Sequence, residues 1–161
     1  MGIDPGLTRL GYGVVESNGS RLKAVDDGTI VTPAGGGTAE RLYSLFREVT
    51  GKIEEHQPEA IAVEKIFFNL NAQTAVPAIQ ASGAALVAAA ASGAEVHEYT
   101  PLEVKSAVVG NGTATKDQVR FMIERLLKIG GTRGADASDA LALAICHLHS
   151  RKLRALEDSP A

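Results

Sequence analysis

The chain has 161 residues, 45% of them apolar, which is enough to bury the core of one domain and short for two. Its net charge is −3 and its pI is about 5.8, so the overall charge does not favour a nucleic-acid partner, and any phosphate-binding surface has to be local. A single cysteine, Cys146, excludes an internal disulfide and favours a reducing, cytoplasmic compartment.

The N-terminal part of the chain predicts three strands and then a helix. Apolar and β-branched residues indicate strands at residues 2–4, 10–16 and 22–31, and Asn18-Gly19 predicts a tight turn that joins the last two into an antiparallel meander. Residues 38–56 then predict an amphipathic helix that lies on the sheet. Its apolar face consists of Leu42, Leu45, Phe46, Val49 and Ile53.

A buried strand is predicted at residues 60–64 and a helix of small residues at 74–92. Residues 66–94 carry no charge, which raises the question of a membrane span. However, Pro77 and four amide side chains interrupt this stretch, and its alanines and glycines supply little hydrophobic drive. We therefore expect a buried helix and no membrane segment.

The C-terminal part predicts one strand and three helices. The strand covers residues 94–99, and the first two helices cover 102–108 and 115–129. Thr115 and Gln118 form a capping-box pattern at the start of the second of these helices, and Gly130 ends it. The final helix has a buried face formed by Ala137, Leu141, Ala144, Ile145 and Leu148.

This order of elements predicts an α/β fold in which a mixed five-stranded sheet, a three-strand antiparallel meander plus parallel strands, is flanked by helices. We expect one domain at residues 1–150 and a frayed tail at 151–161. The first strand would be central, yet only three residues precede Asp4, whereas strands average about five or six. We therefore expect that a few residues before Met1 are missing from this sequence and that stability suffers.

Four acidic residues stand where these elements end or begin. Asp4 closes the first strand, Glu64 closes the fourth, and Asp136 and Asp139 open the final helix, where the spacing i and i+3 places them on one side. Such an arrangement can gather distant carboxylates at one end of the sheet. Clustered like charges repel one another, which favours a bound cation.

The chemistry of this group of acids favours magnesium. Two divalent ions about 4 Å apart can activate a water and neutralise charge on both oxygens during phosphodiester hydrolysis. Oxygen ligands without Cys or His suit Mg²⁺ better than zinc. Each acid also has a purely structural explanation, as a turn residue, a strand end or a helix cap. Four such coincidences at one sheet edge are less probable than a metal site.

Four segments carry a resemblance that spans nearly the whole chain. They are Gly-Ile-Asp-Pro-Gly-Leu-Thr-Arg-Leu-Gly-Tyr-Gly from residue 2, Ala-Val-Glu-Lys-Ile-Phe from 62, Glu-Val-Lys-Ser-Ala-Val-Val-Gly-Asn-Gly from 103 and Ala-Asp-Ala-Ser-Asp-Ala-Leu-Ala-Leu-Ala-Ile-Cys-His from 135. In this order and at these separations the segments resemble the bacterial RuvC family. That family comprises Holliday-junction resolvases with the ribonuclease H-like fold.

The resemblance implies a magnesium-dependent, structure-selective DNA endonuclease that cuts four-way junctions by paired nicks during recombination and repair. Asp4, Glu64, Asp136 and Asp139 would hold two Mg²⁺ ions, for which Mn²⁺ can substitute, and Asp4 would be the ligand shared by both. A water would attack the phosphate in line and the 3′ oxygen would leave.

The resemblance also implies roles for cationic and aromatic residues. Lys105 and Lys116 match family lysines near the scissile phosphate, and Phe67 matches an aromatic that stacks on bases at the opened junction centre. We expect Phe68 to pack inside; the alternative is that the two phenylalanines exchange these roles. Arg120 would contact DNA. Arg125, Lys128 and Arg133 would extend the basic patch around it.

The implied partners are the four-way DNA junction, a second copy of the chain, and the RuvA and RuvB branch-migration complex. Small residues on the helix after Glu64 are candidates for the homodimer interface. Two alternatives stay open: a nuclease of the YqgF type on the same fold, which shares Gly-Ile-Asp-Pro-Gly, and a non-catalytic junction-binding protein.

One further pattern is better explained by packing. Cys146, His147 and His149 resemble a soft-metal cluster, but neighbouring helical positions point in different directions.

Overall fold

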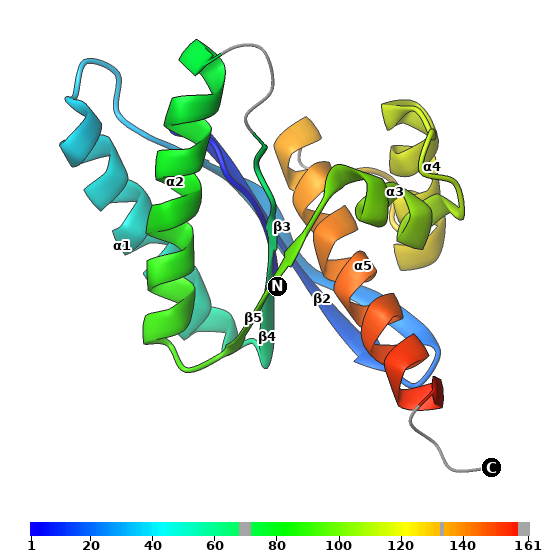
Figure 1. Cartoon of the computed structure of the whole chain (residues 1–161). Coiled ribbons are helices and arrows are strands. Elements are labelled where there is room, and N and C mark those ends of the chain that lie inside the picture. The colour runs from blue at the N-terminus through cyan, green and yellow to red at the C-terminus, as the bar shows by residue number, and fades with distance from the viewer. Residues whose placement is uncertain (68–71, 133, 158–161) are drawn as a thin grey trace.

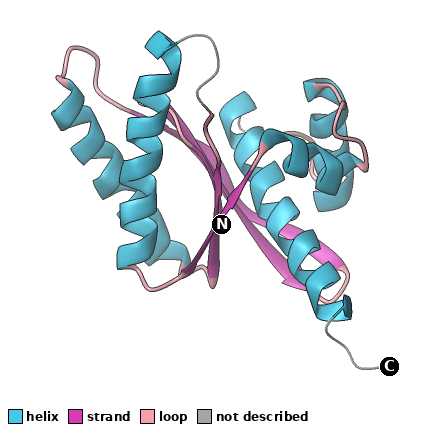
Figure 2. Ribbon diagram, viewed as in Figure 1, coloured by secondary structure: helices cyan, strands magenta, loops and turns pink. Residues whose placement is uncertain are grey.

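The computed structural model describes residues 1–67, 72–132 and 134–157. A five-stranded sheet with the strand order β3-β2-β1-β4-β5 forms the middle layer, and helices cover both of its faces (Figures 1 and 2). The predicted fold class, a mixed sheet flanked by helices, is therefore confirmed.

The antiparallel half of the sheet is a meander of β1 (Gly2–Asp4), β2 (Arg9–Asn18) and β3 (Arg21–Val31). β1 pairs with β2 so that Asp4 lies opposite Gly11. The hairpin between β2 and β3 turns at Gly19, whose φ of 62° suits a residue without a side chain. β2 and β3 are longer than predicted because they keep pairing out to Asn18 and Arg21, where exposed polar residues had hidden the strand period.

The parallel half consists of β4 (Ala60–Glu64) and β5 (Glu95–Tyr99). β4 lies between β1 and β5 and runs parallel to both, and Gly2 aligns with Ala62 while Ile3 aligns with Val63. Continuing this register by one residue brings the ends of β1 and β4, Asp4 and Glu64, side by side.

Two helices cover one face of the sheet and three cover the other (Figure 1). The first pair is α1 (Thr38–His56) and α2 (Ala72–Ala91), which pack against each other and enclose a core with Ile3, Leu10 and Val63. The opposite face carries α3 (Pro101–Val109), α4 (Lys116–Leu127) and α5 (Ala135–Glu157).

Helix α5 lies unusually close to the sheet because glycines face it. A Cβ on Gly2 would come within 2.0 Å of the Ala140 carbonyl oxygen, and one on Gly11 within 2.0 Å of the Asp136 carbonyl oxygen. Gly13 faces Leu141 in the same way. These strand glycines let the first turns of α5 approach the backbone of β1 and β2, which fixes where Asp136 and Asp139 lie.

The structure differs from the predictions mainly at helix ends. α4 ends at Leu127, with Lys128 in the left-handed conformation as its C-cap, two residues before the predicted end. α5 continues past Arg151 to Glu157, so the frayed tail expected from residue 151 is helical as far as Glu157.

Among the described residues, no helix is long and apolar enough to cross a membrane. The predicted packing of Phe68 and the basic patch role of Arg133 concern positions outside the described residues.

Candidate active site

Asp4 and Glu64 meet because of strand register and strand alternation. They end adjacent parallel strands, and each stands two residues after a residue of the face that α5 covers, Gly2 and Ala62. Side chains alternate along a strand, so both carboxylates point toward α5. The predicted meeting of these two acids at one sheet edge is confirmed by this geometry.

Asp139 joins them from α5. A cavity of about 300 Å³ is lined by Asp4, Glu64 and Asp139 together with Lys105 and Lys116. Apolar residues of α3, α4 and α5 complete its wall: Pro101, Val104, Val119, Ala142 and Leu143. Three carboxylates and two ammonium groups thus share one cavity with an otherwise apolar wall.

Burial and mutual repulsion shape the electrostatics of the carboxylates. Burial, followed by the charges of Glu64 and Asp139, raises the pKa of Asp4 to about 7. Burial also raises the pKa of Glu64, while a hydrogen bond between the Glu64 and Asp4 carboxyls acts in the opposite direction on that pKa. The fully ionised cluster is therefore costly without a counter-ion, as a cation site requires.

The two lysines approach the cluster from different helices. Lys116, at the start of α4, places its Nζ 3.1 Å from Asp139 Oδ2, and this contact raises the pKa of the lysine. The Lys116 side chain is 82% exposed, so it reaches over the cavity from the solvent side. Lys105 projects from α3, lines the cavity and is half-buried.

Asp136 is set apart from the other three acids. It does not line the cavity, and its Oδ2 accepts hydrogen bonds from Arg9 Nε at 2.8 Å and from Thr29 Oγ1 at 3.4 Å. Arg9 and Thr29 come from β2 and β3, so Asp136 lies over the meander. Neither residue was predicted from the sequence, because a lone arginine at a strand start and a strand threonine do not signal a partner 127 or 107 positions away.

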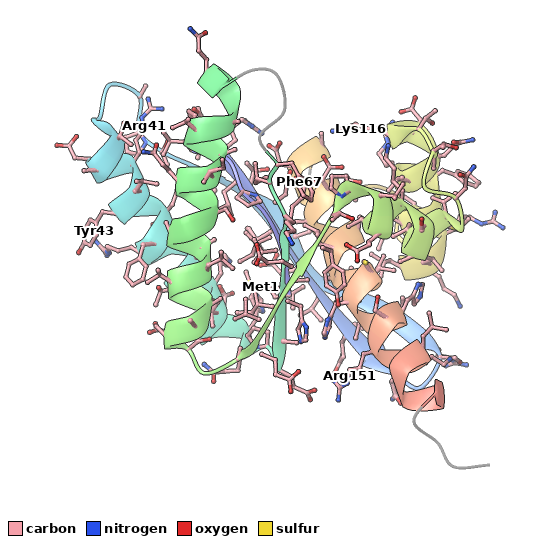
Figure 3. The ribbon with its side chains drawn as sticks, in the orientation of Figure 1. Met1, Arg41, Tyr43, Phe67, Lys116 and Arg151 are labelled. Atoms are coloured by element: carbon pink, nitrogen blue, oxygen red, sulfur yellow. The ribbon has the colours of Figure 1, made fainter. Side chains whose placement is uncertain are left out.

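The predicted DNA-contacting residues lie around the same end of the molecule. Phe67 follows β4 by three residues and is 48% exposed, so it is not a core residue. Figure 3 shows Phe67 and Lys116 at the same end, to either side of the N-terminal turns of α5. Arg120 is exposed on α4, where its nearest described acidic partner is Asp117 at 3.9 Å, and it does not line the cavity.

The histidines near the end of α5 take part in packing. His147 is buried, its Nδ1 lies 2.9 Å from Tyr99 Oη, and burial lowers its pKa to about 4. His149 contacts the Ala107 carbonyl oxygen at 2.8 Å, and burial raises the pKa of the Cys146 thiol to about 11. The side chains of these three residues therefore have different neighbours and form no common metal site, as predicted from their spacing.

Within the described part of the chain, three metal-type ligand atoms lie within 4.8 Å of one another in one group, which consists of Asp26, Glu55 and His56 and not of the cavity acids. Lys52 Nζ lies 3.3 Å from Asp26 Oδ2 and 2.8 Å from Glu55 Oε2, so a cation from the protein already stands beside these carboxylates. This group lies at α1, on the opposite face of the sheet from α5.

Asp4, Glu64 and Asp139 offer carboxylate oxygens to the cavity, and neither Cys nor His is among its described lining residues. Burial raises the pKa of Asp4 and of Glu64, so a cation beside them would be favourable, and these features together fit a hard divalent ion. A ribonuclease H-like sheet that ends in such a carboxylate cluster defines the class of protein: a nuclease of that fold. The chain also matches the family described as crossover junction endodeoxyribonuclease RuvC over residues 1–147.

Known relatives are similar to this chain over almost its whole length. The crossover junction endodeoxyribonuclease RuvC of Syntrophomonas wolfei is 48% identical over 162 residues, covering 100% of this chain and 94% of the relative. That of Pelobacter propionicus is 51% identical over 95% of this chain and 87% of the relative. The structure of Thermus thermophilus RuvC in complex with a Holliday junction substrate is similar with a TM-score of 0.89 at 34% identity, covering 95% and 94% of the two chains. This chain belongs to the RuvC family.

Proposed function

We propose that the carboxylate cluster is the catalytic centre of a magnesium-dependent endonuclease that resolves four-way DNA junctions by paired, symmetrical nicks. The observation that carries the proposal is the shared cavity of Asp4, Glu64 and Asp139 with two lysines, in a chain that matches the RuvC family. The relative that is similar at a TM-score of 0.89 was solved with a Holliday junction substrate.

Asp4, Glu64, Asp139 and Asp136 would hold two Mg²⁺ ions, with Asp4 central because it adjoins both the strand and the helix acids. When bound, the ions supply activation of a water and neutralisation of charge on the attacking and leaving oxygens. The protein contributes the placement of the carboxylate oxygens that would hold the ions. Two rigid strands and one tightly packed helix hold the carboxylates, so the backbone would need little reorganisation when the ions bind.

The lysines would act on the substrate phosphate. Lys105, half-buried in the cavity wall, is placed to donate to a phosphate oxygen near the acids, where excluded water strengthens the interaction. Lys116 is exposed and pairs with Asp139, so it can exchange this carboxylate for a phosphate as DNA enters. Phe67 would stack on a base at the opened junction, and Arg120 would contact the backbone farther out on α4.

The chain would work as a homodimer, so that two sites face opposed strands of the junction. The support is a stripe on α2 whose members are exposed and recur every three or four residues: Val76, Gln80, Gly83, Val87 and Ala90. Val76 and Val87 are 42% and 60% exposed, and Gly83 between them permits close approach of a second helix. We further expect the dimer to act in the cytoplasm with the RuvA and RuvB branch-migration complex.

The catalytic role is tested most simply at Glu64, a strand-end carboxylate that touches no DNA-binding side chain in the proposal. Glu64→Gln should lower the single-turnover rate of junction cleavage in Mg²⁺ by at least about 10³-fold, since it removes a ligand needed by the ions. Junction affinity measured in Ca²⁺ should stay within about threefold of wild type. Retained cleavage by Glu64→Gln would exclude the proposed site.

A further inference from the structure

We propose that Arg9 is a positioning residue that pairs with Asp136 as an internal counter-ion and holds it aside from the other three acids until a divalent ion replaces the arginine. This inference rests on the proposed metal-binding role of the acids. In this order of events, Asp136 joins the other three acids only when the ion binds.

Three observations place Asp136 outside the cluster. The cavity that contains Asp4, Glu64 and Asp139 does not include it. Among the three carboxylates that act on Asp4, Asp136 has the weakest influence. Its Oδ2 is also engaged twice, by Arg9 Nε at 2.8 Å and Thr29 Oγ1 at 3.4 Å.

The backbone around Asp136 is fixed, so only its side chain can change partner. The Asp136 carbonyl oxygen lies against Gly11, where even a Cβ would come within 2.0 Å. Asp136 also stands in the first turn of α5, on the same side of the helix as Asp139. A side-chain rotation is therefore the available route by which its carboxylate can join the cluster.

The Arg9–Asp136 pair is accessible enough to be exchanged. The Arg9 side chain is 57% exposed and that of Asp136 is 29% exposed. An ion pair that water reaches in this way is weak. A divalent ion that gains a further carboxylate can therefore displace the guanidinium, whereas a buried pair would hold.

The two α5 acids are thus neutralised by separate cations from separate elements. Lys116 of α4 pairs with Asp139, and Arg9 of β2 pairs with Asp136. Because Arg9 competes with the ion for Asp136 and also repels it, both effects predict the same sign: removing Arg9 strengthens divalent-ion binding by the DNA-free protein.

The test is a Mn²⁺ titration of the full, DNA-free chain at pH 8 and about 0.2 M salt, with free Mn²⁺ measured by electron paramagnetic resonance; this salt screens distant charges. Arg9→Gln should tighten binding about three- to tenfold. Arg9→Lys keeps the charge and one donor, so its affinity should stay within about twofold of wild type. Arg47→Gln, which removes an exposed charge on α1, controls for net charge and should change nothing.

The decisive comparison repeats Arg9→Gln in a chain that also carries Asp136→Asn. If Arg9 acts through Asp136, the gain disappears there, and the double variant binds like Asp136→Asn alone. An equal gain in both backgrounds, or no gain in the wild-type background, would overturn the proposal. The Asp4→Asn variant tests the proposed metal site separately from the role of Arg9. If Asp4→Asn leaves Mn²⁺ binding unchanged, the proposed metal site itself is wrong.

Discussion

At the scale of single residues, Asp4 is held in surroundings that disfavour its own charge. Burial and the neighbouring acids raise its pKa to about 7, from an ordinary value of 3.8. The folded protein therefore binds this proton more tightly than the unfolded chain does. Without a metal, the contribution of Asp4 to the free energy of unfolding falls as pH rises from about 4 to about 7.

Asp4→Asn should therefore stabilise the metal-free protein. The amide has nearly the same shape but no charge, so in EDTA at pH 8 the free energy of unfolding should rise by about 1–3 kcal/mol relative to wild type. At pH 4 the gain should vanish because wild-type Asp4 is then protonated. Urea denaturation at both pH values measures this difference. A loss of stability at pH 8 would contradict the assigned environment of Asp4.

Phe67 gives a prediction that separates stacking from apolar contact. Phe67→Ala should lower junction cleavage by about 5- to 100-fold, in line with the 1–3 kcal/mol of one base–aromatic stack, while Tm stays within about 2 °C because the ring is half-exposed. The Phe67→Leu variant should cleave the junction as slowly as Phe67→Ala does, and Phe67→Tyr should cleave it at about the wild-type rate. If Phe67→Ala unfolds the protein, the ring belongs to the core and the stacking role is wrong.

At the scale of elements, the fit between α5 and the sheet places the acids that we propose to be catalytic. Gly2 and Gly11 bring the backbone of α5 against β1 and β2, and the carboxylates of α5 face the strand ends as a result. A substitution that leaves every acid in place but enlarges one of these glycines should therefore impair both stability and cleavage.

Gly11→Ala tests this directly. Its Cβ would meet the Asp136 carbonyl oxygen within 2.0 Å, so α5 has to shift, and we expect a loss of about 1–3 kcal/mol in the free energy of unfolding. Cleavage should fall at least about tenfold in the folded fraction, because small displacements of catalytic groups are costly. Gly51→Ala, where a Cβ meets nothing within 4 Å, should be neutral or slightly stabilising. Equal behaviour of the two variants would argue against close packing as the positioning device.

The sequence predicted most of these elements because their periods are regular. The predicted bounds of α1 and β4 agree with the structure, and Asp4 and Glu64 were expected at one sheet edge because they end apolar strands. The separate position of Asp136 was not predictable, since its partner Arg9 is brought there by strand pairing alone. Helix ends were also less predictable: α5 continues beyond the exposed residues 151–153 to Glu157, where no apolar period signals a helix in the sequence.

At the scale of the whole molecule, catalysis and dimerisation are proposed for different parts of the fold. The carboxylates lie toward α5, whereas the exposed stripe of Val76, Gly83 and Val87 lies on α2, across the sheet (Figure 1). A second copy docked on α2 would leave both acidic cavities open. Two sites related by a two-fold axis could then cut opposed strands of one junction.

The most direct measurement is cleavage of a mobile four-way DNA junction labelled on each strand in turn, in Mg²⁺, beside a linear duplex of the same sequence and the Asp4→Asn variant. We predict nicks at symmetrical positions on two opposed strands of the junction, ligatable without further processing, with no cleavage of the duplex and none by Asp4→Asn. Equal cutting of junction and duplex, or cleavage that survives Asp4→Asn, would contradict a junction resolvase that works through this carboxylate cluster.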